Sequence, residues 1–280
     1  MRFGVTIFCT DVSIQPAELA LALQERGFDS MWVPEHTHIP TSRRSPYPNG
    51  GELPEEYKRC HDPFVALTAA AVAAPGLRVG TGILLVAQRD PIVTAKAVAS
   101  LDQVSGGRLT LGIGVGWNED EMEDHGVDYK RRRDMGREHM LAMRRLWEDE
   151  EASFDGEFVH LPPSWSWPKP VQSPLPVLIG GAAGPKLFNH IAEYADGWIP
   201  IGGRGLTETV PELRARVEEA GRDPSTLEIV PVAVVPDPGK LDHYQEVGVT
   251  ECVFGLPSAP RDDVLAILDK YAATLQERRA

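Results

Sequence analysis

Apolar runs suited to buried strands recur along the whole chain and alternate with amphipathic segments suited to helices. Near-continuous apolar runs are typical of parallel strands that are covered on both faces. The strand-like segments lie at residues 2–8, 30–36, 79–86, 109–116, 177–181, 197–201, 227–235 and 251–256. The helical segments lie at residues 16–26, 63–74, 91–104, 135–149, 185–195, 207–220, 241–246 and 261–278.

This alternation predicts a (β/α)8 TIM barrel, formed as a single domain by residues 1–280. In that fold the active site is built from the loops that follow the strands. Three connections, 37–62, 117–134 and 150–176, are too long for plain turns, so we expect insertion segments at the C-terminal face. The first follows the second strand at that face, whereas the third, with Trp165, Trp167 and Pro168, could cover a barrel edge. A doubly wound open sheet is the structural alternative.

Local signals support the third helical segment in particular. Asp90 is a predicted N-cap, and Pro91 occupies the first helical position, where a missing N–H costs nothing. Gly106 is predicted to end that helix, because glycine adopts the left-handed conformation without a Cβ clash. Asp62 is the corresponding cap of the helix that starts at Pro63.

Glycines cluster in the third and fourth strand-like segments, at Gly80, Gly82, Gly112, Gly114 and Gly116. Glycine weakens a strand, so such positions indicate either a bend or a close approach to the backbone. Inward-facing glycines can also relieve crowding inside a closed barrel. Five of them at two neighbouring strand exits favour a flat ligand.

Composition narrows the classes of partner. The formal net charge is −13, so there is no basic field to attract nucleic acid or an anionic membrane. The three cysteines, Cys9, Cys60 and Cys252, are widely spaced, which argues against a disulfide framework and a clustered zinc site. The chain starts directly as a strand, and no apolar run approaches the ~20 residues that cross a bilayer. We therefore expect a cytoplasmic protein that acts on a small-molecule substrate.

The second strand-like segment ends in residues that could move protons. Glu35, His36 and His38 are expected at the mouth of the barrel, and an imidazole can give or take a proton near neutrality. We predict His36 as the catalytic acid or base, with Glu35 as a second catalytic residue that biases it. His36 and His38 would share a face while Glu35 points the other way, unless the chain has already turned. His61 could line the same pocket.

A metal site is the alternative use of the His-x-His pattern. Metal-dependent hydrolases on this fold need further ligands from other strands. The exits of the fifth, sixth and eighth strands carry Gly180-Gly181, Ile201-Gly202 and Leu256-Pro257 instead of histidine or carboxylates. We therefore predict no bound metal.

A loop of small residues follows the fifth strand-like segment. Gly180, Gly181, Ala182 and Ala183 lead into a helix, and the free N–H groups of a helix start can bind a phosphate. Arg204, after the sixth strand, could contribute charge to the same site.

Together these motifs resemble the bacterial luciferase-like oxidoreductases, which are flavin- or deazaflavin-dependent TIM barrels. The similarity rests on Val79-Gly80-Thr81-Gly82-Ile83, Asp90-Pro91, Ala95-Lys96, Leu101-Asp102, Ser105-Gly106-Gly107-Arg108, Leu111-Gly112-Ile113-Gly114-Val115-Gly116-Trp117, and Pro168-Lys169-Pro170-Val171-Gln172 leading to Ile179-Gly180-Gly181.

The resemblance implies a planar cofactor across the barrel mouth, with its phosphate on Gly180, Gly181, Ala182 and Ala183. Thr81, Gly82 and Ile83 would support the ring, and Gly116 and Asn118 would complete the binding site. In the branch that uses coenzyme F420, a non-proline cis peptide lies behind the ring, and the motif aligns it with Gly82-Ile83. His36 matches a histidine near the reactive carbon.

One position departs from the sugar-phosphate dehydrogenases of that branch. Where they have a glutamate after the strand-four glycines, this chain has Trp117, which suggests an apolar or aromatic substrate. The leading interpretation is therefore hydride transfer between F420 and an apolar or unsaturated organic substrate.

Three alternatives remain at this point. The first is an FMN-dependent monooxygenase of the same superfamily, supplied with electrons by a flavin reductase. The others are a metal-dependent hydrolase and a non-catalytic protein that only binds the cofactor. The resemblance also implies a homodimer.

Overall fold

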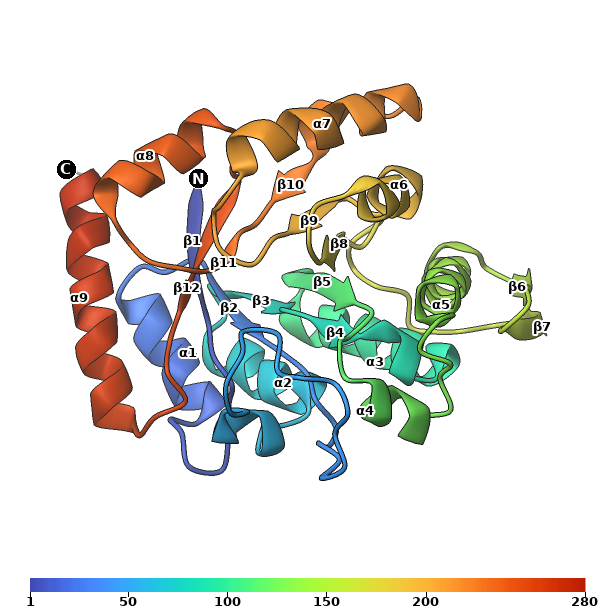
Figure 1. Cartoon of the computed structure of the whole chain (residues 1–280), viewed down its shortest axis with the longest axis horizontal. Coiled ribbons are helices and arrows are strands. Elements are labelled where there is room, and N and C mark those ends of the chain that lie inside the picture. Colours follow the sequence, from blue (N-terminus) through green and yellow to red (C-terminus); the bar gives the residue numbers. More distant parts are fainter. Residues whose placement is uncertain (280) are drawn as a thin grey trace.

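The computed structural model describes residues 1–279, in which strands and helices alternate from one end of the chain to the other (Figure 1). The strands are β1 (Arg2–Thr6), β2 (Ser30–Val33), β3 (Arg78–Thr81), β4 (Leu84–Leu85), β5 (Leu109–Gly114), β6 (Ala152–Asp155), β7 (His160–Ser164), β8 (Val177–Gly180), β9 (Gly197–Ile199), β10 (Glu228–Ile229), β11 (Val232–Val234) and β12 (Glu251–Gly255).

The α-helices are α1 (Pro16–Glu25), α2 (Pro63–Ala73), α3 (Pro91–Ser105), α4 (Glu119–Asp124), α5 (Arg132–Glu148), α6 (Pro185–Tyr194), α7 (Leu206–Glu219), α8 (Pro238–Glu246) and α9 (Arg261–Arg279). Three short 3₁₀ helices add to them: η1 (Glu55–Lys58), η2 (Val86–Gln88) and η3 (Pro224–Thr226). The predicted helices are all found, whereas α4 and η1, inside two of the long connections, were not predicted.

Parallel strands form one curled sheet, in the order β10-β9-β8-β5-β3-β2-β1-β12-β11. From β1 to β10 the path follows the order of the chain, with β4 paired to β5 off the path and β6 and β7 in a separate sheet, and β1 pairs with β12. This order lacks the reversal that defines a doubly wound sheet, so that alternative is wrong. The two ends of the path, β10 and β11, are consecutive parts of one segment.

Two predicted strands are interrupted. The run at 79–86 is divided into β3 and β4 by a cis peptide bond between Gly82 and Ile83, as the resemblance implies. The run at 227–235 is divided into β10 and β11 around Pro231, which has no N–H to continue a ladder.

The predicted helix boundaries have the expected capping groups. The Asp90 carboxylate accepts a hydrogen bond from Val93 N at 2.8 Å, and Pro91 follows as the first helical residue of α3. Gly106 ends α3 with φ of 66°, in the left-handed region that favours glycine. Asp62 caps α2 through Phe64 N and Val65 N.

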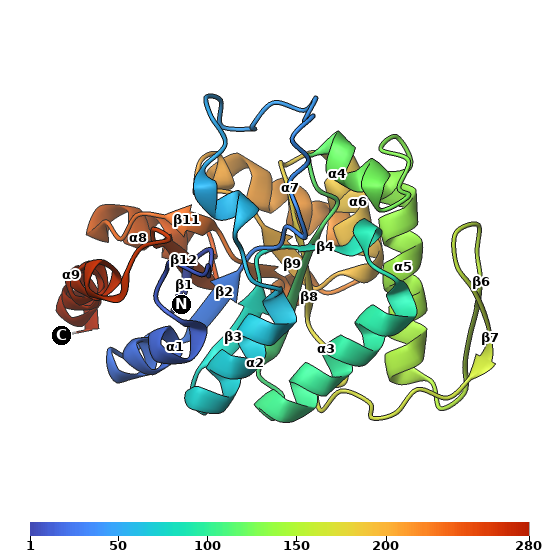
Figure 2. The same cartoon turned by 90° about the horizontal axis from the view of Figure 1, so that it is seen from below.

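The three long connections go to different places. Figure 2 shows the loop after β2 and helix α4 together at the edge where the strands end. The third connection, 150–176, instead forms an antiparallel hairpin of β6 and β7 on the outer side of α5 (Figures 1 and 2). This connection follows a helix and precedes a strand, so it lies away from the edge where the strands end. Its later part is bound near the start of β5, where Gln172 Nε2 donates to Leu109 O at 2.7 Å.

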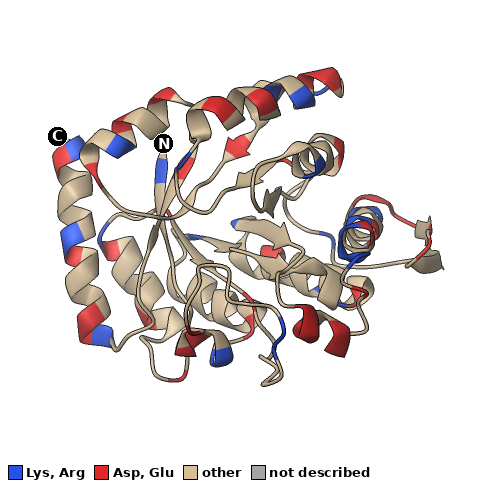
Figure 3. Cartoon of the chain, in the orientation of Figure 1, with Lys and Arg blue, Asp and Glu red and all other residues tan. Residues whose placement is uncertain are grey.

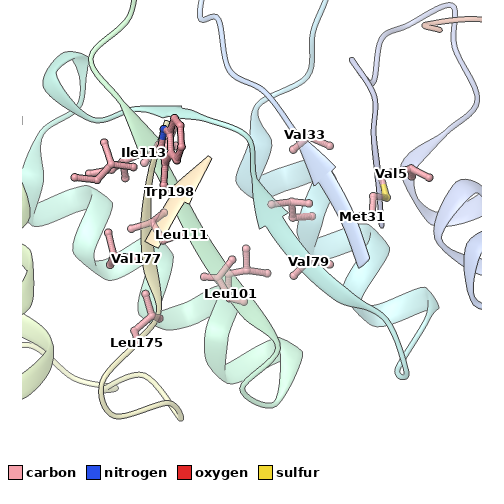
Figure 4. Packing of buried hydrophobic residues seen from close by; sticks show 14 of the residues in the cluster. Val5, Met31, Val33, Val79, Leu101, Leu111, Ile113, Leu175, Val177 and Trp198 are labelled. Carbon is pink, nitrogen blue, oxygen red and sulfur yellow. The ribbon is translucent and has the colours of Figure 1, made fainter. Parts of the chain in front are cut away.

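Alternate side chains of each strand build two apolar layers. One layer lies between the sheet and the helices, and Figure 4 shows Met31, Val33 and Val79 pointing into it. The other lies inside the curl and contains Trp32, with Ile83 packed against it. The interior of the sheet is therefore filled with side chains, and ligands are accommodated only beyond the strand ends. In residues 1–279 we find no helix long and apolar enough to cross a membrane.

Candidate active site

His36 lies just beyond the end of β2 and is paired with a carboxylate from α4. Its Nδ1 is 2.8 Å from Glu121 Oε2, and the two side chains are 6% and 1% exposed. Helix α4 is the acidic segment of Figure 3 that follows β5. The histidine predicted to be catalytic therefore has an acidic partner that the sequence did not identify.

Aromatic rings surround this pair. The His36 ring lies 5.2 Å from the Tyr57 ring and 5.9 Å from the Trp117 ring, centroid to centroid. Tyr47 contacts both Tyr57 and Trp117 edge-on, at 5.4 and 6.3 Å. We call Tyr47, Tyr57 and Trp117 the aromatic wall. Trp117 thus lies beside the predicted catalytic residue, which is consistent with its prediction as a substrate-pocket residue.

Two tyrosines of the wall come from the insertion after β2, which is fastened to α4. The Arg44 guanidinium pairs with Asp120 and Glu123, and Ser45 Oγ accepts from Glu119 N at 3.0 Å. These contacts hold the loop against the same helix that supplies Glu121.

Glu35 points to a different set of partners. Its carboxylate accepts from Leu85 N at 2.6 Å and from Arg89 Nε at 2.5 Å, and Arg89 also pairs with Asp62. Burial raises the pKa of the Glu35 carboxyl above its ordinary value, while Arg89 and the Leu85 N–H oppose that rise. Both oxygens are occupied, so in this structure Glu35 connects β2 to the segment after β4, and its proposed catalytic role stays a prediction.

His38 and His61, the other two histidines considered for this site, make no hydrogen bond or ring contact with the His36–Glu121 pair that defines it. β2 ends at Val33, so the alternation of a strand does not extend to His36 and His38. The His38 side chain is 42% exposed, and its Nε2 lies 3.0 Å from Asp124 Oδ2. His61 is bound through its backbone, with N donating to Cys9 O at 2.8 Å. Within residues 1–279 no three histidine, cysteine, aspartate or glutamate side chains are grouped so that they could hold a metal ion.

Most of the strand glycines make room for protein side chains. A Cβ on Gly80 would lie 2.5 Å from the Trp32 ring, and a Cβ on Gly114 or Gly180 would lie 2.6 Å from the Ile83 side chain. These positions therefore relieve crowding inside the sheet, which is the simpler of the two interpretations. Their consequence for the site is indirect, because they fix Ile83 beneath the barrel mouth.

The remaining predicted ring contacts are backbone groups. The Thr81 hydroxyl donates to Gly112 O at 2.7 Å, so only its main chain is available to a ligand. Gly82 meets nothing closer than Trp32 carbons at 3.7 Å. Gly116 has φ of 73°, a conformation that side-chain-bearing residues rarely adopt.

Three buried polar side chains near this end of the sheet have atoms without a partner. Both amide atoms of Gln88, both amide atoms of Asn118 and the Oε1 of Glu121 make no hydrogen bond within the described chain. Gln88 and Asn118 are 9% and 1% exposed. A Cβ on Gly116 would lie 3.7 Å from Gln88 Nε2, which places this amide beside the strand-five exit. Leaving such groups unpaired costs ~1–3 kcal/mol each, so they indicate a polar ligand edge.

The predicted phosphate loop leaves its amides accessible. Ala182 and Ala183 are exposed small residues just before α6, and their N–H groups bond to no acceptor among residues 1–279. Gly180 also lines a small pocket between α5 and α6, together with Arg133 and His190. Arg133 has no ion pair within the described chain, and it was not among the predicted site residues.

Residues that sequence reasoning missed lie in the connection after β5 and in the short segment between β4 and α3. Glu121 belongs to the acidic run at 119–124, which reads as a solvated segment until the structure pairs it with His36. Gln88 and Arg89 lie after a strand whose interruption hides their position.

Comparisons with known proteins agree with this architecture. A sequence profile of the luciferase-like monooxygenase family matches residues 14–236, so the chain belongs to that family. It is 45% identical over 279 residues to "Uncharacterized protein Rv0953c" of Mycobacterium tuberculosis, covering 98% of this chain and 99% of that protein.

Two further proteins bear on the cofactor and the fold. The F420-dependent glucose-6-phosphate dehydrogenase of Gordonia bronchialis is 30% identical, over 79% of this chain and 64% of its own length. The crystal structure of the monooxygenase RslO1 from Streptomyces bottropensis superposes with a TM-score of 0.78 at 20% identity, covering 100% of both chains. The family contains F420-dependent oxidoreductases and monooxygenases, and this protein has their oxidoreductase fold.

Proposed function

We propose that the protein is an F420-dependent oxidoreductase that acts on an apolar, unsaturated organic substrate. The observation that carries the proposal is the His36–Glu121 pair, buried beside the aromatic wall and next to unpaired buried amides. We further propose that the curled sheet is a complete eight-stranded barrel, since the segment of β10 and β11 bonds to β9 at its start and to β12 at its end.

The residues present fit a planar cofactor with an anionic tail. Gln88 and Asn118 would offer donors and acceptors to the polar edge of a heterocycle, and Ile83, which packs against Trp32, would support its ring. The N–H groups of Ala182 and Ala183 would bind a phosphate at the start of α6. When bound, the reduced deazaflavin supplies a hydride and the oxidised form accepts one.

The protein's own residues would then position the substrate and move the proton. The aromatic wall offers flat apolar surface, which suits a planar or unsaturated substrate and excludes water from it. His36 supplies the proton that completes addition across an activated double bond, and solvent restores that proton to the imidazole. In the reverse oxidation His36 receives the proton.

An FMN-dependent monooxygenase is the second candidate, supported by the fold shared with RslO1. Sequence favours F420, because the relative at 30% identity is described as F420-dependent. A site for FMN would also require a flavin reductase as a partner.

The test is a pair of fluorescence titrations of the purified protein, one with F420 and one with FMN. We expect F420 to bind at least about tenfold more tightly than FMN. The Gln88→Leu variant should weaken F420 binding by about tenfold, since one amide contact contributes ~1–3 kcal/mol. Gln103→Leu, at an exposed amide on α3, is the control and should bind as the wild type does. Tighter binding of FMN, with oxygen-dependent product formation, would overturn the assignment.

A further inference from the structure

The contact between His36 and Glu121 does more than place two groups side by side. A carboxylate accepts hydrogen bonds and does not donate them, so a carboxylate oxygen 2.8 Å from Nδ1 favours the ring form that carries its proton on Nδ1. We propose that Glu121 is a positioning residue that holds His36 in its Nδ1–H form and leaves Nε2 as the nitrogen that exchanges protons with the ligand. The role of Nε2 in proton exchange rests on the proposed function. The assignment of the proton to Nδ1 rests only on the contact between His36 and Glu121.

Among the groups around the His36 ring, Glu121 determines which ring nitrogen carries the proton. Tyr57 contacts the ring, and Cys60 Sγ donates to the His36 carbonyl at 3.1 Å. Burial raises the pKa of the Tyr57 hydroxyl and of the Cys60 thiol, so both are neutral near pH 7. Trp117, on the other side, carries no charge. Glu121 is therefore the ionisable group left to orient the imidazole.

The other ring nitrogen is available. Within residues 1–279, Nε2 of His36 has no hydrogen-bond partner, whereas Nδ1 is engaged. Glu121 itself is held by α4, which the Arg44 and Ser45 contacts fasten to the loop after β2. A histidine whose orientation is fixed by a second residue is pre-organised for proton transfer, because the correct tautomer is present before the ligand binds.

The same helix provides a matched comparison. Asp124 contacts His38 Nε2 at 3.0 Å, but these two side chains are 60% and 42% exposed. An exposed pair exchanges with water and fixes little. Removing the carboxylate at position 124 should therefore leave His36 unchanged.

The experiment measures the ring nitrogens of His36 by two-bond ¹⁵N NMR in the protein without cofactor, with His36→Asn used for assignment. We expect the neutral wild-type ring to carry its proton on Nδ1. In Glu121→Met, which replaces the carboxylate by an apolar chain of similar length, the proton should move to Nε2. In Asp124→Leu it should stay on Nδ1. A wild-type ring protonated on Nε2 overturns the proposal, and this result needs no variant at position 121 to fold.

A second readout separates positioning from packing. If Glu121 only filled space, Glu121→Met would keep the wild-type ring signature; that outcome would also overturn the proposal. Failure of the proposed function would show itself differently, as an absence of F420 and FMN binding in the wild type with the Nδ1–H form intact.

Discussion

Glu251 at the start of β12 and Glu121 in α4 are both buried carboxylates, at opposite ends of the sheet. Glu251 has partners for both oxygens: Oε1 accepts from Trp32 Nε1 at 2.9 Å and from the Ser30 hydroxyl, and Oε2 accepts from Arg2 Nε at 2.9 Å. Glu121 has a partner for one oxygen, and Oε1 has none within the described chain.

The difference separates a structural end from a functional end. Around Glu251 the polar groups bond to one another, and pairing between β1, β2 and β12 holds the strand starts together. At the other end, polar side-chain atoms of Gln88, Asn118 and Glu121 have no hydrogen-bond partner within the described chain. Unsatisfied buried groups lower stability and persist where a ligand completes them.

The largest expected effect is on stability at the structural end. Glu251→Ala should lower the free energy of unfolding by about 3 kcal/mol, because it leaves Arg2, Ser30 and Trp32 without their common acceptor. Urea unfolding measures it. Glu228→Ala, which removes the more exposed carboxylate from Arg2, is the control and should cost less than about 1 kcal/mol. Equal losses in both variants would contradict the role given to Glu251.

At the functional end the expected effect is on turnover. His36→Ala should lower kcat by about 10²-fold in the reduction of 2-cyclohexen-1-one by reduced F420, since a general acid is lost. The thermal midpoint should also fall, because loss of the ring leaves the buried Glu121 carboxylate without its partner, whereas F420 affinity should stay near the wild-type value. If affinity fell as much as kcat, His36 would be a binding residue instead.

Much of the framework could be predicted from local sequence. The apolar runs predicted the strands, and the side chains of Asp62 and Asp90 with the glycine at position 106 predicted helix ends, because capping depends on neighbours within a few residues. The cis bond at Gly82-Ile83 followed from the family motif. In each case the residues that determine the strand, the helix end or the cis bond lie close to it in the sequence.

The rest depends on contacts between distant segments. His36 and Glu121 are 85 positions apart, and no local pattern links them. The use of Gly80 and Gly114 became clear only when Trp32 and Ile83 were placed against them. The hairpin of β6 and β7 was missed because its position outside α5 follows from packing and not from its composition.

A smaller effect is expected at Gly114, whose missing side chain makes room for Ile83. Gly114→Ala would bring a Cβ within 2.6 Å of Ile83 Cδ1, and overpacking of this kind costs ~1–3 kcal/mol. We expect a lower unfolding free energy and weaker F420 binding. Adding Ile83→Val removes Cδ1, the nearest clashing atom, but leaves Cγ1 at 2.9 Å, so it should restore part of both. Without that rescue, the glycine would not be serving Ile83.

The smallest effect concerns thiol reactivity. Burial raises the pKa of Cys9 and of Cys252 to about 12, so at pH 8 only about one thiol in 10⁴ is ionised. Alkylation with iodoacetamide should be slow for both and rise about tenfold per pH unit between pH 8 and 10. Cys9, which lies beside the site loops, should react faster than Cys252 through local opening. Faster reaction of Cys252 would mean that the structural end opens first.

The most direct test asks whether F420 provides the hydrogen-bond partners that the side-chain amides of Gln88 and Asn118 lack. Their ¹⁵N NMR signals are followed as F420 is added, and the Gln88→Leu and Asn118→Leu variants provide the assignments. We predict that both signals shift and that their hydrogens exchange more slowly with water once the cofactor is bound. Saturation with F420 while both signals stay unchanged would contradict the account, because the unpaired amides would then serve no ligand.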